Sequence, residues 1–199
     1  MLTKWTVERS HYLYKDQFLN HRIDRCITRE GVVVDPYHVI EYSDWINVVA
    51  VTPALELLMV REYRHGAGFI ATGLPSGTFN PGDNALSCAK RELREETGAE
   101  ARSWYPTARV FANPAVMTNQ VYSFLAIDLD LGGETHFDDS EEIETMPMPV
   151  TEVYRGLLTG GLRVQGLHLA SLYAAAAFVR GSEDQVLAPL RDAISRAYE

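Results

Sequence analysis

Three glutamates, Glu92, Glu95 and Glu96, fall close together in a segment with helical character. On an α-helix, residues three and four positions apart share one face, so all three carboxylates are expected to point the same way. Like charges at this spacing destabilise a helix by a few tenths of a kcal/mol per pair, roughly, unless something offsets them. Carboxylate oxygens gathered on one side are the ligands that Mg²⁺ and Mn²⁺ prefer. The spacing therefore favours a divalent-metal site.

A solvated helix face would explain the same glutamates, because glutamate is a good helix former. The neighbouring basic residues that could balance their charge are Lys90, Arg91 and Arg94. The hexapeptide RELREE does not by itself separate the two interpretations.

The residues upstream favour the metal site. Gly77 is followed after five residues by Asp83, and after seven more by Arg91-Glu92; Glu95-Glu96 and Gly98 complete the series. This pattern resembles the Nudix box, Gly-x5-Glu-x7-Arg-Glu-x2-Glu-Glu-x-Gly, at every fixed position except the first glutamate, where this chain has Asp83. So many fixed positions make the pattern specific.

The resemblance implies a role for each matching residue. The metal ligands fall on Glu92 and Glu96, with Glu95 assisting and with the main-chain carbonyl of Ser76 as a further oxygen. Arg91 would orient the carboxylates through ion pairs. Asp83 would be one of its partners, and it also suits the N-cap of the helix.

Four further segments resemble the ADP-ribose pyrophosphatase branch of the family: DWINVVAVT, LLMVREYRHG, GLPSG and FANPAVMTNQVYSFLA. Pro114 lies 16 residues beyond Gly98, as is usual in that branch. The resemblance implies that Arg64 lies near the phosphates or the nucleotide, with Arg61 and His65 as helpers. Trp45 offers an aromatic face for a base; a place in the core or in a dimer interface would explain it equally well.

The acidic segment 134–144 offers a general base. Glu141 fits the branch pattern best and Glu142 is its rival, while a solvated acidic loop is the alternative. Glu95 and Arg91 complete the expected catalytic set. The resemblance implies hydrolysis of a nucleoside diphosphate linked to another group, with Mg²⁺ or Mn²⁺ as cofactor. ADP-ribose, giving AMP and ribose 5-phosphate, is the first expectation.

Two departures from the branch pattern keep other functions open. This chain has Gly73 where the branch usually has a glutamate, and Asn119 where it tends to have an acidic residue. The alternatives are a pyrophosphohydrolase of nucleotide sugars, dinucleotides or nucleoside triphosphates, and a non-catalytic Nudix-fold regulator that binds a nucleotide. The intact set of glutamates favours an enzyme.

The surrounding pattern predicts an α/β (α+β layered) fold, which the resemblance makes a Nudix-type α/β/α sandwich with a mixed sheet, an N-terminal β extension and C-terminal helices. Residues 1–45 would be a strand-rich segment with a turn at Asp35-Pro36, exchanged between the subunits of a homodimer, and 46–199 the Nudix domain. A hairpin is expected across Pro53. The remaining expected strands are 66–72, 104–112, 120–129 and 146–150. The expected helices are 84–97, 151–159, 167–179 and 184–198.

Composition limits the partners. The chain has 199 residues and a formal net charge of -9, which argues against a nucleic-acid-binding surface. Two cysteines provide no disulfide framework. No secretory signal or membrane-spanning segment is expected at the start or elsewhere, so a cytoplasmic location and a small-molecule substrate are predicted.

Overall fold

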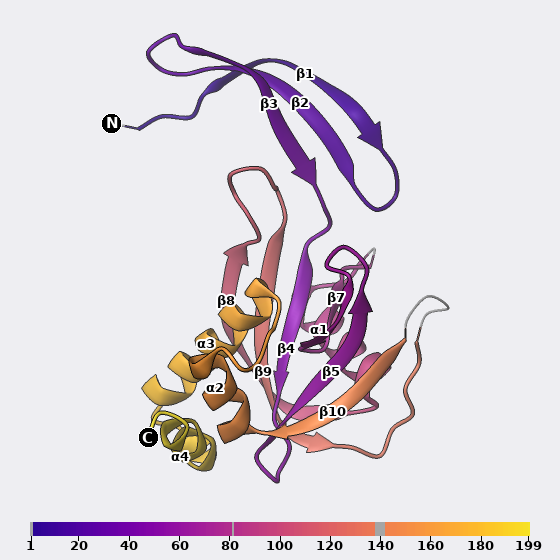
Figure 1. The fold of residues 1–199 in the computed structure, drawn as a ribbon, viewed down its shortest axis with the longest axis vertical. Helices are drawn as coiled ribbons and strands as arrows, with labels where there is room; N and C mark the ends of the chain where they lie inside the picture. Colours follow the sequence, from indigo (N-terminus) through magenta and orange to yellow (C-terminus); the bar gives the residue numbers. More distant parts are fainter. Residues whose placement is uncertain (1, 81, 138–141) are drawn as a thin grey trace. The chain divides into compact units, whose positions relative to one another are not determined.

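The computed structural model describes residues 2–80, 82–137 and 142–199. The chain divides into two compact units, which Figure 1 shows in the colours of the sequence. The smaller unit contains Met1–Asp44 and Val110–Gln120, and the larger unit contains Trp45–Arg109 and Val121–Glu199. None of the described helices is long and apolar enough to cross a membrane.

The smaller unit is built on an antiparallel sheet in the order β1 (Thr6–Lys15), β2 (Asn20–Ile27) and β3 (Val33–Glu41). The predicted turn at Asp35-Pro36 is wrong, because β3 runs through both residues. The pairing shifts register there, so that Asp35 and Pro36 form a bulge against β2. A proline fits at a bulge in an edge strand because it has no N–H to donate to the sheet.

Two sheets form the larger unit. One has the order β7 (Ser76–Thr78), β4 (Trp45–Ala50), β9 (Gln120–Asp130) and β8 (Glu100–Phe111), with β4 and β9 parallel. The other is antiparallel and has the order β10 (Ile143–Pro149), β5 (Glu56–Arg64) and β6 (Phe69–Gly73). The sheet that contains β4 and β9 is therefore mixed, as predicted.

The predicted hairpin across Pro53 is confirmed only in part: the chain reverses there with an antiparallel bridge between Val51 and Leu57, but β4 and β5 belong to different sheets. The chain turns a tight corner between them, where the N–H of Thr52 donates to the carbonyl of Glu56 at 2.8 Å. β4 is almost entirely buried and β5 is buried over residues 57–60, and each of these stretches is rich in apolar residues. Such a run identifies a strand but does not indicate its partner.

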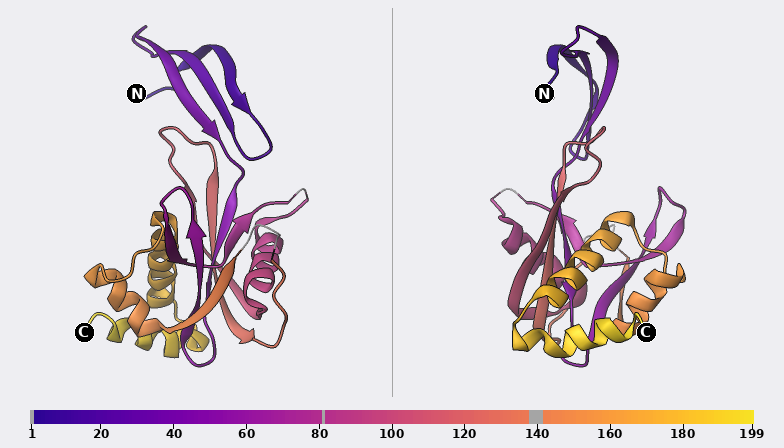
Figure 2. Two further views of the ribbon diagram at one scale, coloured as in Figure 1. Left: turned by 45° about the vertical axis from the view of Figure 1, so that its right-hand side comes forward. Right: turned by 90° about the vertical axis from the view of Figure 1, so that its left-hand side faces the viewer.

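Helices cover both faces of β4. The helices are α1 (Ala85–Thr97), α2 (Val150–Thr159), α3 (Gly166–Gly181) and α4 (Ala188–Arg196), with a 3-10 turn at Gln185–Leu187. Ile46, Val48 and Ala50 pack in the cluster under α1, whereas Val49 and Val51 pack against α2–α4. Figure 2 shows α1 (magenta) on one side of the strands and the C-terminal helices on the other. This arrangement is the predicted α/β/α sandwich.

Candidate active site

The helix α1 begins one residue later than the sequence predicts. Its N-cap is Asn84, whose side chain accepts the N–H of Ser87 while the Ser87 hydroxyl accepts the N–H of Asn84. The prediction of Asp83 as N-cap is wrong, because its carboxylate instead accepts the N–H of Asn80 at 3.1 Å. Gly98 ends the helix as predicted, with a left-handed φ of 68°.

The buried face of α1 contains both apolar and acidic residues. Ala89 and Leu93 are fully buried, whereas Leu86 is 36% exposed and Cys88 packs against the core instead. Burial raises the pKa of the Cys88 thiol to about 12, with Glu92 adding to the effect. Because α1 packs through Cys88 and Ala89, the positions one turn further along, Glu92 and Leu93, also turn inward.

The two glutamates that were predicted as principal metal ligands are both buried. Glu92 is 8% and Glu96 6% exposed. Together with Glu95 and Ser76 they line a cavity of about 340 Å³. One carboxylate oxygen of Glu96 accepts the main-chain N–H of Ser76 at 3.2 Å. The structure therefore brings all four predicted metal-binding residues to one cavity.

Gly77 makes room for this arrangement. A Cβ atom at this position would lie 2.0 Å from Cδ of Glu92 and 2.1 and 2.3 Å from its two carboxylate oxygens. The carboxylate therefore lies directly against the glycine backbone, at the end of the cavity where β7 meets α1. Glycine at position 77 thus leaves the space that the Glu92 carboxylate fills, and carboxylate oxygens are the ligands that a divalent cation prefers.

Arg91 neutralises part of the acidic charge. Its Nη1 lies 2.7 Å from Glu92 and 3.0 Å from Glu95, and its Nη2 donates to the carbonyl of Thr78 at 2.9 Å and to Asp83 at 3.3 Å. Asp83 thus reaches Arg91 although its side chain is one methylene shorter than glutamate. Burial alone would lower the pKa of Arg91, but Glu92 and Glu95 outweigh it and raise the pKa above its ordinary value.

Among the described residues, no three Asp, Glu, His or Cys side chains lie close enough together to form a finished metal site. The guanidinium of Arg91, between Glu92 and Glu95, explains part of this spacing. Buried carboxylates need such a partner because an unpaired buried charge is costly. Joint coordination by Glu92, Glu95 and Glu96 stays a prediction.

Trp45 and Arg64 line a second cavity of about 650 Å³, together with His65. This cavity shares Arg64, Ser76 and other residues with the first one. The indole N–H of Trp45 is buried and has no hydrogen-bond partner among the described residues. Arg64 forms an ion pair with Glu62. Of the predicted substrate residues, Arg64 therefore lies in the cavity that contains the carboxylates and Trp45 lies in the adjoining one.

The other candidates are placed differently. Arg61 lies on the opposite face of β5 from Arg64, because strand residues alternate between faces, and it pairs with Glu144 at 3.2 Å. It is not among the described residues that line the two cavities. Glu142 is exposed directly before β10, and Glu141 lies outside the described residues.

A model of the NUDIX domain matches residues 44–164, which include all of the residues that line the 340 Å³ cavity. The chain belongs to the Nudix family. An ADP-ribose pyrophosphatase from Mycobacterium tuberculosis (strain ATCC 25618 / H37Rv) is 30% identical over 145 residues, which cover 72% of this chain and 70% of that protein. The ADP-ribose pyrophosphatase of Bacillus subtilis (strain 168) is 25% identical over 118 residues.

The match to the Bacillus protein covers 59% of this Nudix chain and 64% of that protein, which is slightly less than two thirds of its length. A solved structure described as an ADP compounds hydrolase superposes with a TM-score of 0.78 over 91% of this chain and 97% of its own. Its sequence identity is 20%, so the superposition supports the fold. The two relatives found by sequence agree with the predicted branch of the Nudix family.

The structure adds site residues that the sequence did not indicate. Glu62 lines both cavities, and its position could have been inferred because it alternates with Tyr63 and shares a face with Arg64. His136 lines the 340 Å³ cavity, and its main-chain N–H donates to the carbonyl of Glu95 at 2.9 Å. His168 lines the larger cavity from α3, far away in the sequence. Neither histidine belongs to a motif.

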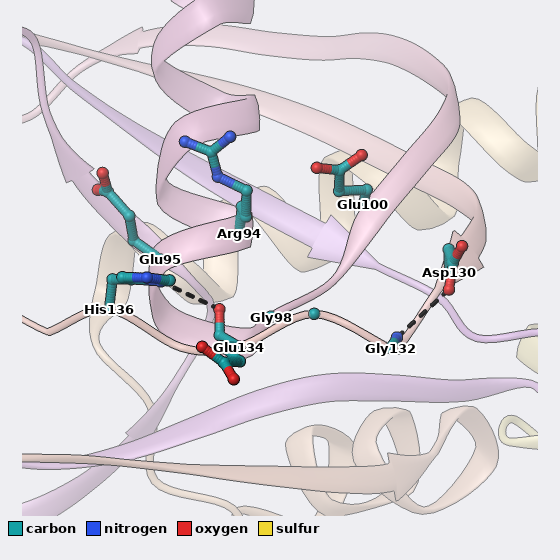
Figure 3. A pocket seen from close by; sticks show the side chains of 9 residues that line it. Arg94, Glu95, Gly98, Glu100, Asp130, Gly132, Glu134 and His136 are labelled. Atoms are coloured by element: carbon teal, nitrogen blue, oxygen red, sulfur yellow. Dashed lines mark hydrogen bonds between the residues drawn. The ribbon is translucent and has the colours of Figure 1, made fainter.

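A third cavity, of about 700 Å³, lies beside the C-terminal end of α1 (Figure 3). Its lining is mainly acidic, with Glu100, Asp130 and Glu134 beside Arg94. Glu95 and His136 border both this cavity and the 340 Å³ one. The 340 Å³ cavity contains as many acidic residues, but it also contains two arginines, Arg64 and Arg91, together with the glutamates of the Nudix box, so the site of chemistry is assigned there.

Proposed function

We propose that this Nudix protein is a metal-dependent pyrophosphohydrolase that cuts the diphosphate of a nucleoside diphosphate linked to another group. ADP-ribose, giving AMP and ribose 5-phosphate, is the substrate that the relatives favour. One observation carries the proposal: Glu92, Glu95 and Glu96 line a cavity that continues into a larger one containing Trp45.

The residues of the chain divide the work between them. Glu92 and Glu96, with Glu95 and the Ser76 carbonyl, would hold Mg²⁺ or Mn²⁺, and Arg91 would keep the carboxylates in position. A bound divalent cation supplies electrostatic stabilisation of the phosphate oxygens and lowers the pKa of water. Arg64, which lines both cavities, would bind a phosphate oxygen.

A carboxylate is also needed to accept the proton of the attacking water. Among the described residues Glu95 is the best placed, because it lines the cavity and its side chain remains 33% exposed. The acidic-segment residues Glu141 and Glu142 are the alternatives. Each is converted to glutamine, and kcat is measured together with Mn²⁺ affinity: loss of the base lowers kcat on the order of 100-fold or more at unchanged Mn²⁺ affinity, whereas loss of a metal ligand also weakens Mn²⁺ binding.

The test is product analysis with a panel of ADP-ribose, nucleotide sugars, dinucleotides and nucleoside triphosphates, with Mg²⁺ or Mn²⁺. We expect AMP and ribose 5-phosphate from ADP-ribose. Glu96→Gln should lower kcat on the order of 100-fold or more, whereas Glu183→Gln, a matched change at an exposed site, should have no effect. An active Glu96→Gln variant would refute the site. Binding of a nucleotide with no hydrolysis of any compound would indicate a regulator instead.

We also propose that the protein forms a homodimer through its N-terminal sheet. Val7, Leu13 and Tyr14 on β1 are each more than half exposed, which is unusual for so many large side chains on one strand. Burial against a second copy would remove this surface from water. Light scattering coupled to size exclusion should give twice the mass of one chain, and Leu13→Asp should lower it; a monomeric wild-type protein would contradict the proposal.

A further inference from the structure

His168 is a buried histidine in the first turn of α3, and it is 3% exposed. Its Nδ1 accepts the main-chain N–H of Leu74 at 3.1 Å. A nitrogen that accepts a hydrogen bond has no proton, so in the neutral ring the proton is on Nε2. Burial, together with the positive charge of Arg64, lowers the pKa of His168 to about 4. At neutral pH the ring therefore offers one donor, Nε2–H.

The residue that carries this donor lines the 650 Å³ cavity. Its Nε2 has no hydrogen-bond partner among the described residues. The described side-chain atoms that lack a partner and are sealed from solvent do not include Nε2, so this nitrogen is accessible to solvent. A polar group that is neither satisfied by the protein nor sealed from the cavity is available to a ligand.

Gly73 and the base of α3 hold the ring in this place. A Cβ atom on residue 73 would lie 2.6 Å from Nδ1 and 2.8 Å from Cε1 of His168. The ring cannot easily move away, because α3 is fixed to the sheet one turn later by Ser171. The hydroxyl of Ser171 lies 2.9 Å from Nδ2 of Asn47 and 2.7 Å from the hydroxyl of Ser123. His168 thus occupies the space that a side chain at position 73 would take.

The surroundings indicate which part of a nucleotide reaches this donor. The end of the cavity shared with the carboxylates contains Arg64 and suits the diphosphate. Much of the remaining lining is aromatic or apolar, with Trp45, Phe69, Ala71 and Val164, and the polar side chains of Thr72 and Gln165 lie among them. A planar, largely apolar group with hydrogen-bond acceptors on its edge fits this lining, and a nucleobase has this character.

We propose that His168 is a nucleobase-binding residue, which donates a hydrogen bond from Nε2 to an acceptor on the base, and that Gly73 provides the space for its ring. The proposal rests on the proposed function, because it assumes that the diphosphate lies at the carboxylates. It gives a physical reason for Gly73, the position at which the chain departs from the glutamate usual in the branch.

Two substitutions separate the binding role of His168 from its structural role. His168→Asn places an amide oxygen where Nδ1 accepts from Leu74, but it removes the distal donor. His168→Gln places an amide N–H near the position of Nε2 but loses the acceptor for the buried Leu74 N–H. We expect His168→Asn to lose nucleotide affinity with little loss of stability. We expect His168→Gln to show the opposite pattern.

The test compares two monophosphates: AMP, which carries a nucleobase, and ribose 5-phosphate, which carries none. Each is titrated by calorimetry with Mg²⁺ present. Loss of one neutral hydrogen bond should weaken AMP binding to His168→Asn by about tenfold and leave ribose 5-phosphate unchanged. His168→Gln should bind AMP with an affinity close to that of the wild-type protein. Equal affinity of the wild-type protein and His168→Asn for AMP, or an equal loss for both ligands, would overturn the assignment. A wild-type protein that does not bind AMP would overturn the nucleotide function as well.

A double-mutant cycle tests the role of Gly73. Gly73→Ala should weaken AMP binding by displacing the ring, again by about tenfold. In a His168→Ala background the same change should have no further effect, because no ring remains to be displaced. Additive losses in the double variant would refute the link between Gly73 and His168.

Discussion

The contact between Gly77 and Glu92 provides a sharp test of the site, through the single change Gly77→Ala. The added Cβ would lie 2.0 Å from Cδ of Glu92, whereas nonbonded carbon atoms rest at about 3.5 to 4.0 Å. One of the two groups must therefore move by more than about 1 Å. The carboxylate is the end of a flexible side chain, so we expect Glu92 to move while the backbone of β7 stays in place.

The size of the effect follows from that displacement. A misplacement of about 1 Å in a catalytic arrangement can cost on the order of 100-fold in rate, which corresponds to about 2.7 kcal/mol in activation free energy. The fold should tolerate the change, because Gly77 does not need a left-handed backbone conformation. We therefore expect kcat to fall about 100-fold while the free energy of unfolding changes by less than about 1 kcal/mol.

The assay compares kcat, Mn²⁺ affinity and thermal unfolding for Gly77→Ala and for the control Gly181→Ala. Gly181 ends α3, has no left-handed φ, and would have nothing within 4 Å of an added Cβ. The control should match the wild-type protein in all three measurements. If Gly77→Ala keeps kcat within about threefold of the wild-type value, Glu92 does not act from the place where the structure puts it.

Three further predictions concern stability. Because the pKa of His168 is about 4 when folded and 6.5 as an ordinary value, the unfolded chain binds a proton that the native protein does not bind between these pH values. The free energy of unfolding should thus fall by about 2 kcal/mol more between pH 7 and 5 in the wild-type protein than in His168→Asn; equal losses in urea titrations would contradict this. Gly98→Ala should lower Tm, because φ is 68° and the Cβ would lie 2.3 Å from the rigid main-chain oxygen of Gly133; an unchanged Tm would exclude that clash. Leu93→Ala should cost about 2 to 5 kcal/mol in urea denaturation, and Leu86→Ala much less because Leu86 is 36% exposed; similar costs would show that α1 packs through another face.

The sequence predicted the elements better than it predicted their pairing. The helix with its Gly98 stop and the C-terminal helices were predictable, because caps and apolar periodicity act within a few residues. The partner of β5 was not, because its two neighbours in the sheet, β6 and β10, lie at very different distances along the chain. An apolar strand can be buried equally well in several positions, and only the packing of the whole sheet selects one.

The candidate site shows the same division. The box glutamates, Arg91 and Ser76 could be assigned to one place because they lie on one helix and on the short strand β7 before it. His168 could not, because it contacts Leu74 across 94 positions of sequence, and a lone histidine in an apolar helix carries no motif. The space beside Gly73 became apparent only from the position of that ring.

The central claim is that Glu92, Glu95 and Glu96 bind divalent metal, and Mn²⁺ titration followed by electron paramagnetic resonance tests it without reference to any substrate. We predict that the wild-type protein removes free Mn²⁺ from solution, and that a folded variant with all three glutamates changed to glutamine does not. The same number of Mn²⁺ ions bound with the same affinity by that variant would contradict the claim.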